Sequence, residues 1–150
     1  MVQVGETAPD FALEDQSGQT VSLSALKGKT VVLFFYPKAD TSGCTVEACG
    51  FRDGKAHFDD KNVILLGMSP DPVKAQSKFA VKYDLTMQLL ADEDHKVAEA
   101  YGVWAEKSMY GRQYMGIDRT TFVIGPDGRI RNVFTKVKPN GHSEEVLSVL

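Results

Sequence analysis

The chain has 150 residues, with 17 Lys and Arg against 20 Asp and Glu, which gives a formal net charge of −3. Hydrophobic residues make up 43% and charged residues 25%, which is ordinary for a globular protein, and the length predicts a single domain over residues 1–150. The sequence contains no block of five like charges and no apolar run near the roughly 18 residues of a membrane span. We therefore expect neither nucleic acid nor a membrane as a main partner.

The cysteine content indicates a redox or metal role for one short segment. The only two cysteines, Cys44 and Cys49, are five residues apart, whereas a disulfide-stabilised secreted fold would carry more of them, spread along the chain. The first residues, from Met1 to Phe11, lack the charged and apolar regions of a signal peptide, so we expect a cytoplasmic protein. In a reducing compartment, such a close pair is more often catalytic or metal-binding than structural.

The first predicted elements are a hairpin and a buried strand. Residues 11–15 and 20–23 flank Gln-Ser-Gly-Gln, the pattern of a β-hairpin, and residues 26–29 form a turn. Residues 31–36, Val-Val-Leu-Phe-Phe-Tyr, are an unbroken apolar run that Pro37 ends. Such a run is typical of a strand buried on both faces.

Helices and strands then alternate to the C-terminus. A helix is predicted from residue 41 to about 59, with Ser42 as its N-cap, and another opens at Asp71-Pro72 and runs to about Tyr83. The remaining predicted elements are strands at 63–68 and 87–91, a helix at 93–101 closed by Gly102, a hairpin of 120–124 with 130–134, and a helix at 143–150. This order predicts a three-layer α/β domain that contains the thioredoxin fold with an N-terminal β-hairpin extension.

Cys44 lies where a helix start favours a thiolate. The first turn of a helix has backbone N–H groups without intrahelical partners, and the positive end of the helix dipole favours an anion. An ordinary thiol with a pKa of about 8.5 is only a few per cent ionised at pH 7, and one helix terminus contributes typically about 0.3–1 kcal/mol. A cation is therefore needed as well, and Arg119, at the mouth of the strand 120–124, is the candidate. Lys38 is nearer in sequence but is expected to point into solvent.

Three further residues are candidates for this site. Thr41, three residues before Cys44, can place its hydroxyl beside the sulfur. Pro37 ends the buried strand and can shield the pocket from water. Glu47, one helical turn after Cys44, opposes a thiolate unless Arg119 or another cation offsets its charge.

These residues resemble the active-site motif of a known family. Pro37-x-x-x-Thr41-x-x-Cys44 is similar to the peroxiredoxin motif, and the segment from Thr45 to Cys49 resembles the bacterioferritin-comigratory, or Q-type, subfamily. The similarity runs from about Val4 to the C-terminus. It includes four downstream blocks, Tyr101–Trp104, Met109–Gly111, Tyr114–Ile117 and Arg119–Phe122.

The resemblance implies a thioredoxin-dependent peroxidase of the atypical 2-Cys type. Cys44 would be the peroxidatic cysteine, Cys49 would resolve its sulfenic acid as an intramolecular disulfide, and Thr41 and Arg119 would hold the peroxide oxygens. Pro37 would shape the pocket, and Glu47 is a possible supporting residue. Thioredoxin or a similar dithiol protein would reduce the disulfide, without metal, flavin or haem, and we expect a monomer, with a dimer also open.

Other functions and plainer roles stay open at this point. A thioredoxin-like disulfide oxidoreductase would carry Cys-x-x-Cys, but here four residues intervene, and a zinc module would need three or four clustered ligands. A free cysteine is usually a small buried hydrophobe, which applies above all to Cys49. Arg119 could form a plain surface salt bridge, Thr41 could simply begin a helix, and Glu47 could be a solvated helix residue.

The spacing of the cysteines predicts a conformational change. On an α-helix, residues five apart have Cα atoms roughly 8.6 Å apart and side chains that diverge. A disulfide requires Cα atoms within about 7 Å. Cys44 and Cys49 therefore cannot bond until the helix between them unwinds.

Overall fold

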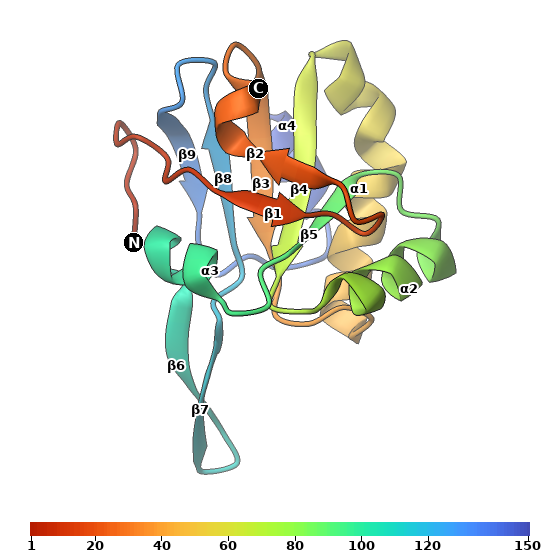
Figure 1. Cartoon of the computed structure of the whole chain (residues 1–150), viewed down its shortest axis with the longest axis vertical. Coiled ribbons are helices and arrows are strands. Elements are labelled where there is room, and N and C mark those ends of the chain that lie inside the picture. The colour runs from red at the N-terminus through yellow and green to blue at the C-terminus, as the bar shows by residue number, and fades with distance from the viewer.

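The central sheet has five strands in the order β5-β4-β3-β8-β9, and all 150 residues are described by the computed structural model. Its strands are β3 (Thr30–Phe35), β4 (Val63–Ser69), β5 (Gln88–Ala91), β8 (Thr120–Ile124) and β9 (Ile130–Phe134). The first three run parallel, while β8 pairs antiparallel with both β3 and β9 (Figure 1). Because β3 is central and apolar on both faces, it lies between the two halves of the core.

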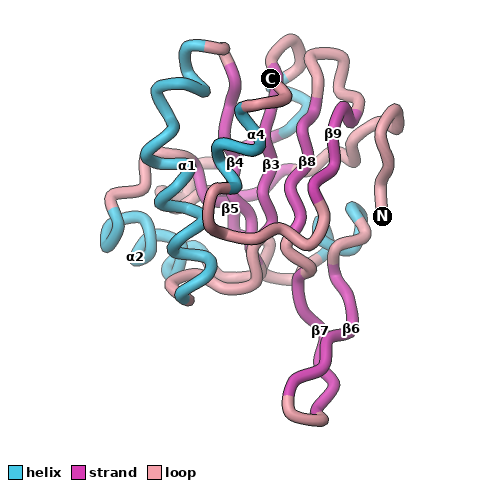
Figure 2. The backbone as a smooth tube through the Cα atoms, turned by 180° about the vertical axis from the view of Figure 1, so that it is seen from behind, coloured by secondary structure: helices cyan, strands magenta, loops and turns pink.

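Each face of the sheet is covered by its own layer. Helices α1 (Ser42–Asp60), α2 (Val73–Tyr83) and α4 (His142–Leu147) pack on the face that Val32, Phe34 and Tyr36 present (Figure 2). The opposite face is covered by α3 (Lys96–Tyr101), the hairpin of β1 (Ala12–Glu14) and β2 (Thr20–Ser22), and the 3₁₀ helix Leu23–Leu26 (Figure 1). The predicted three-layer α/β architecture and N-terminal hairpin are confirmed. None of the helices combines the length and apolar composition that crossing a bilayer requires.

One hairpin was not predicted. Strands β6 (Trp104–Met109) and β7 (Arg112–Ile117) pair only with each other, and they project from the body as an arm, residues 104–117 (Figures 1 and 2). Tyr110 and Gly111 connect them with φ of 52° and 76°, the left-handed pair that a two-residue hairpin turn needs. Tyr-Gly is not one of the common Asn-Gly or Asp-Gly signals for such a turn, and the strands carry little regular alternation of apolar residues.

Helix boundaries differ from the predicted ones by a few residues. The N-cap of α1 is Thr41 rather than Ser42, and α3 begins at Lys96 rather than at residue 93. The second difference has a local cause, because His95 is left-handed and the Asp92 carboxylate accepts the N–H groups of Val97 and Ala98 at 3.2 and 2.9 Å. Helix α4 covers 142–147 instead of 143–150.

Candidate active site

Cys44 lies in the first turn of α1, at the carboxyl end of β3. The chain leaves β3 at Phe35, passes through Tyr36 and Pro37, and enters α1 at Ser42. The Cys44 side chain is buried and unpaired with Cys49, since both thiols are free. A buried sulfur at a helix N-terminus is the position predicted for the nucleophile.

Arg119 joins Cys44 to Glu47. The residue precedes β8, which is hydrogen-bonded to β3, so its guanidinium reaches the start of α1. One guanidinium nitrogen, Nη2, donates to Cys44 Sγ at 3.4 Å, and the other, Nη1, donates to Glu47 Oε1 at 2.8 Å. The predicted cation therefore does face the sulfur. Lys38, by contrast, is exposed, as expected.

Gly43 makes room for this contact. A Cβ atom at residue 43 would lie 3.1 Å from Arg119 Nη2 and 3.4 Å from the Pro139 ring. The first contact is tight, so the guanidinium would have to shift by a few tenths of an ångström to make room for a side chain there. The absence of a side chain at position 43 is thus part of how the sequence builds the site.

The charged side chains of the site are partly or fully buried, and burial influences their pKa values. Burial raises the pKa of Glu47 to about 7, although the Arg119 charge and hydrogen bond act in the opposite direction. Burial acts to lower the pKa of Arg119, but the negative charges of Cys44 and Glu47 outweigh it, so the net direction is upward. Glu47 Oε2 is buried and has no hydrogen-bond partner. Arg119 therefore stays charged, while Glu47 is poised between its two forms near neutral pH.

The segment from Pro37 to Thr41 forms the rim of the site. Pro37 is half-buried and follows the last residue of the apolar run, as expected. Thr41 caps α1, but its hydroxyl donates to the Lys38 carbonyl at 2.8 Å. In this conformation, the Thr41 oxygen can meet the sulfur or a bound peroxide only as an acceptor.

Cys49 belongs to the same unbroken helix as Cys44. Helix α1 continues from residue 42 to residue 60, so the cysteines keep the helical separation that prevents a disulfide. Cys49 is half-buried and packs against the hydrophobic core between the sheet and the layer of α1, α2 and α4. The reduced protein therefore holds the two sulfurs apart.

Comparison with known proteins assigns the chain to a family. The model of the AhpC/TSA family matches residues 4–133. The peroxiredoxin Bcp of Escherichia coli is 46% identical over 99% of this chain and 96% of its own length. The peroxiredoxin Bcp of Bacillus subtilis is 45% identical over 99% and 95%. The chain belongs to the AhpC/TSA family, as a Bcp-type peroxiredoxin.

The fold of this peroxiredoxin also matches a solved relative. The bacterioferritin comigratory protein of Xanthomonas campestris superposes with a TM-score of 0.91 at 34% identity, covering 99% of this chain and 95% of that one. The thioredoxin-like fold expected from the sequence is thereby confirmed.

A buried hydrogen-bond network, which sequence reasoning missed, holds the rim of the peroxiredoxin site. Tyr36 donates to Gln76 Oε1 at 2.5 Å, Gln76 donates to Ser69 at 2.8 Å, and Ser69 donates to Asp71 at 2.6 Å. Asp71 also accepts the N–H of Ala39 at 2.8 Å. The network therefore fixes both ends of the turn around Pro37. The polar residues Ser69 and Asp71 at the end of β4 were the available signal. From the sequence alone, we interpreted Asp71 only as the start of a helix.

Residues at the end of α2 form a second set of hydrogen bonds that holds the chain on either side of the site, at the protein surface. Asp40 accepts hydrogen bonds from Lys82 at 2.9 Å and from the Tyr83 hydroxyl at 2.8 Å. Arg52, further along α1, donates to the Tyr83 carbonyl at 2.6 Å. Tyr83 thus contacts the chain on both sides of the segment that carries the two cysteines.

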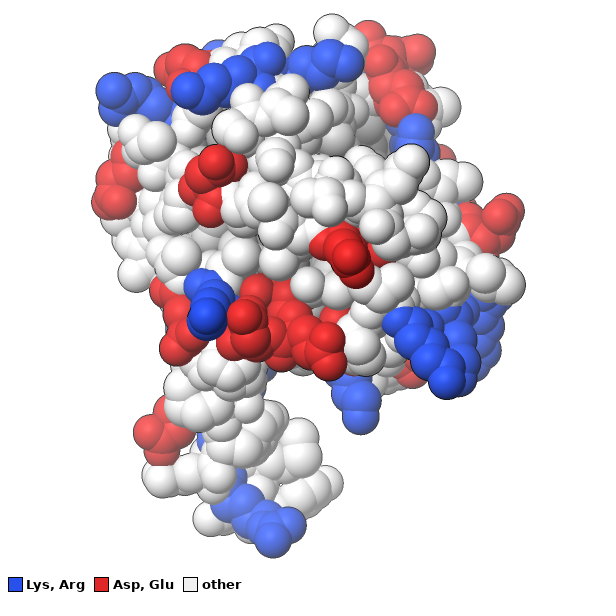
Figure 3. All heavy atoms as spheres, viewed as in Figure 1, with Lys and Arg blue, Asp and Glu red and all other residues white.

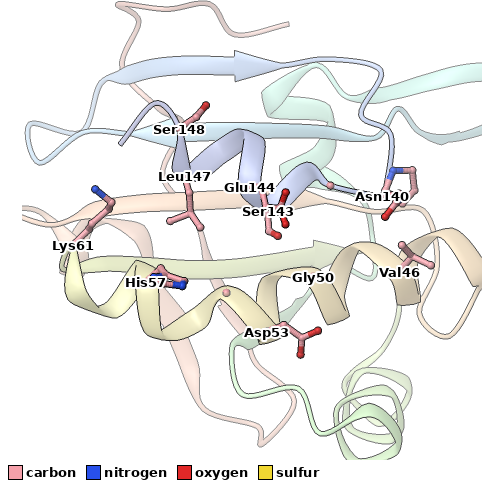
Figure 4. A pocket seen from close by; sticks show the side chains of 13 residues that line it. Val46, Gly50, Asp53, His57, Lys61, Asn140, Ser143, Glu144, Leu147 and Ser148 are labelled. Atoms are coloured by element: carbon pink, nitrogen blue, oxygen red, sulfur yellow. The ribbon is translucent and has the colours of Figure 1, made fainter.

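A groove of about 900 Å³ runs along the surface where α1 and α4 meet (Figure 4). Mostly polar side chains line it, among them Asp53, His57 and Glu144. Gly50 allows α4 to approach, because a Cβ there would lie 3.3 Å from Ser143 Oγ. Neither cysteine lines this groove, but Val46 and Gly50, which lie beside them on α1, do.

Proposed function

We propose that this peroxiredoxin reduces hydrogen peroxide and organic hydroperoxides through Cys44. The observation that carries the proposal is the Arg119 guanidinium, which hydrogen-bonds the buried Cys44 sulfur and is held by Glu47. Family membership supports it, and the solved Xanthomonas campestris relative is described by its alkyl peroxide reduction activity. A disulfide oxidoreductase is the alternative, but the family and the four residues between the cysteines speak against it.

In the first step, the Cys44 thiolate attacks one peroxide oxygen. A sulfur–oxygen bond forms while the oxygen–oxygen bond breaks, and the leaving oxygen takes up a proton as water or alcohol. Cys44 becomes a sulfenic acid, oxidised by two electrons. Arg119 stabilises the negative charge that develops on the departing oxygen, and Thr41 accepts a hydrogen bond from the peroxide and orients it.

In the second step, Cys49 attacks the sulfenic sulfur. A disulfide forms and the sulfenic oxygen leaves as water. Because residues 44–49 are helical in the reduced protein, at least one turn of α1 must unwind first. Breaking a few hydrogen bonds costs about 1 kcal/mol each net. This cost is small enough for thermal fluctuations to unwind the turn transiently.

In the third step, a dithiol protein such as thioredoxin returns both cysteines to thiols by thiol–disulfide exchange and is itself oxidised to a disulfide. Unwinding exposes the disulfide, so one motion serves both resolution and reduction. Recycling of this kind requires a reducing compartment, in keeping with the cytoplasm expected from the sequence.

Peroxide-dependent NADPH oxidation, coupled through thioredoxin and thioredoxin reductase, tests the activity. We expect turnover with hydrogen peroxide and with an alkyl hydroperoxide, and no reduction of insulin disulfides in the absence of thioredoxin. Insulin reduction without peroxide turnover would support the oxidoreductase instead. Repeating the assay with glutaredoxin identifies the reductant.

Amide hydrogen exchange of the reduced and disulfide forms tests the unwinding. We expect residues 42–50 to lose protection in the disulfide form while residues 51–60 keep it. Equal protection of residues 44–50 in both forms, with the disulfide confirmed by mass, would refute local unwinding.

A further inference from the structure

The arm, residues 104–117, lies at the same end of the molecule as the peroxidase site. Strand β3 ends and α1 begins at the end of the sheet from which the arm projects (Figures 1 and 2). Strand β7 ends at Ile117, and Arg119, which hydrogen-bonds Cys44 Sγ, follows two residues later. Two residues span at most about 7 Å. The root of the arm therefore lies within two residues and one arginine side chain of the sulfur.

The arm exposes apolar side chains that the peroxide reaction does not use. Nine large hydrophobic side chains of the chain are exposed, and four of them lie on the arm: Met109, Tyr110, Tyr114 and Met115. A fifth, Val46, lies on α1 between the two cysteines. Because β6 and β7 pair only with each other, both outer edges of the arm have unpaired backbone groups. The arm therefore has the properties of a surface that another molecule covers.

One face of the arm combines apolar groups with positive charge. Lys107 pairs with Tyr114 and Met109 pairs with Arg112 in the ladder, so these four side chains share a face. The one acidic residue of the arm, Glu106, belongs to the opposite face. Figure 3 shows acidic residues gathered where the arm joins the body and basic residues toward its tip. The outer part of the arm thus favours a partner whose contact surface is apolar and acidic.

The size of the arm indicates which partner meets it. Six residues per strand give the arm a length of about 20 Å, whereas hydrogen peroxide is smaller than one side chain. A dithiol domain of about 100 residues has a radius of gyration of about 13 Å. Its bulk therefore extends beyond the short distance from the Cys44 sulfur to the root of the arm. A partner of this size that brings its thiols to the site lies against the arm.

We propose that the arm is the docking surface for the dithiol protein that reduces the disulfide of Cys44 and Cys49. The inference rests on the proposed function, because that disulfide is what brings such a partner to the site. The partner packs an apolar surface on Met109 and Tyr110, and acidic side chains at its rim face Arg112. Its thiolate attacks one sulfur of the disulfide, and its second thiol then releases both cysteines as thiols, which leaves the partner as a disulfide.

Steady-state turnover with two reductants tests the docking. Arg112→Glu and Tyr110→Ser should each raise the KM for thioredoxin about tenfold, since Arg and Tyr at interfaces often contribute much of the binding energy. High salt should raise the wild-type KM for thioredoxin and change that of Arg112→Glu less. With dithiothreitol, which is too small to need a docking surface, both variants should turn over like the wild type.

Two variants at the opposite end of the body are the matched controls. Lys29 is exposed and precedes the first residue of β3, and Val149 lines a hollow with Thr30 and Val63, where β3 and β4 begin. Lys29→Glu reverses a charge and Val149→Ser removes an exposed apolar side chain, so both should keep the wild-type KM for thioredoxin. A rise in KM as large in these controls as in the arm variants would contradict docking on the arm.

Amide hydrogen exchange observes the binding without turnover. The disulfide form is mixed with a thioredoxin whose two active-site cysteines are replaced by serine, so no reaction follows, and we expect slower exchange of the arm amides. Unchanged exchange there, or a wild-type KM in both arm variants, would overturn the docking while leaving peroxide reduction intact. A wild type that dithiothreitol reduces but thioredoxin does not would overturn it as well. Absence of turnover with dithiothreitol would instead contradict the proposed function, and the docking with it.

Discussion

The two halves of α1 are held in place by different means. The leading half, residues 42–50, buries small or polar groups, namely Cys44, Glu47 and Ala48, and is fixed by side-chain hydrogen bonds from Arg119. The trailing half, residues 51–60, buries Phe51 and Phe58. Phe51 stacks on Phe34 of β3 with ring centroids 4.4 Å apart and also contacts Phe58. One half is anchored by polar contacts and the other by the aromatic core.

This difference decides where the helix can open. Exposing one buried Phe costs about 1.5–3 kcal/mol, whereas a hydrogen bond exchanged for water costs about 1 kcal/mol. Unwinding that begins at Ser42 is therefore inexpensive up to residue 50 and expensive from Phe51 onward. Both cysteines lie within the leading half, which makes it the part of the protein that is suited to rearrangement.

Replacing the proposed nucleophile, Cys44, gives the largest expected effect. Cys44→Ser should reduce peroxidase turnover to background, because a hydroxyl is a far poorer nucleophile than a thiolate at neutral pH. The coupled NADPH assay measures it, with circular dichroism as the check that the variant folds. Substantial residual turnover would place the chemistry elsewhere than at the leading half.

Removal of the second cysteine should separate the two steps. Cys49→Ser should consume one peroxide per chain but lose thioredoxin-driven cycling, because the sulfenic acid has no partner. Mass spectrometry should then show increased sulfinic acid at Cys44 after excess peroxide. Undiminished cycling would show that Cys49 does not resolve the intermediate, and the need to unwind α1 would disappear with it.

Much of the body of the fold could be predicted because its strands are apolar runs with clear ends. Residues 31–36 and 63–68 predicted β3 and β4 within one residue, since buried parallel strands have continuous hydrophobic sequences. The arm could not be predicted, because beyond its root at Trp104 and Ile117 it is mostly exposed, and burial imposes no alternation on its sequence. Its left-handed turn at Tyr110 and Gly111 appears only in the structure.

The site was predictable where a residue type implies chemistry. Cys44 and Arg119 were predicted from a helix start and the need for a cation, and the structure places them in contact. Distances between elements far apart in sequence carry no local signal, so the sequence could not reveal that Asp71 holds Ala39 or that Tyr83 holds Asp40. The sequence also could not reveal that the Thr41 hydroxyl donates to the Lys38 carbonyl.

Arg119 is the strongest polar anchor of the leading half. Arg119→Ala should slow the peroxide step about 10²–10³-fold, the usual effect of losing a donor to a developing oxyanion. It should also slow alkylation of Cys44 at neutral pH, measured with iodoacetamide across a pH series. Arg119→Lys should recover only part of the rate, because an ammonium lacks the fork that bonds Cys44 and Glu47 together.

The same substitution removes the cation that lowers the pKa of Glu47 and the hydrogen bond to its Oε1, so Glu47 stays buried without a partner, which is destabilising. Arg119→Ala combined with Glu47→Gln removes that carboxyl and is the matched control for a folding defect. If the double variant is stable but still slow, the loss belongs to the chemistry. A normal rate of peroxide reaction in either variant would exclude Arg119 from the site.

Glu47 should make stability depend on pH. Burial raises its pKa to about 7 in the folded protein, above the value of about 4.3 for an exposed Glu, so the folded state binds the extra proton between these values. The contribution of Glu47 to stability is thus fully present below about pH 4 and is lost as pH rises to about 7. Urea unfolding should show Glu47→Gln gaining stability relative to wild type over this interval, and a pH-independent difference would contradict the burial argument.

The anchor on α2 should give the smallest effect. Tyr83→Phe removes the hydroxyl that donates to Asp40 but keeps the ring that packs on Phe79. A hydrogen bond contributes about 0.5–1.5 kcal/mol net, and an exposed one lies at the low end, since Lys82 still holds Asp40. Release of the chain just before the leading half should therefore speed disulfide formation about two- to fivefold.

Rapid acid quenching and mass spectrometry after a single peroxide addition measure that rate. Lys74→Ala, on exposed α2 surface, should leave it unchanged, and a Tyr83→Phe rate equal to wild type would show that unwinding begins without movement of Asp40.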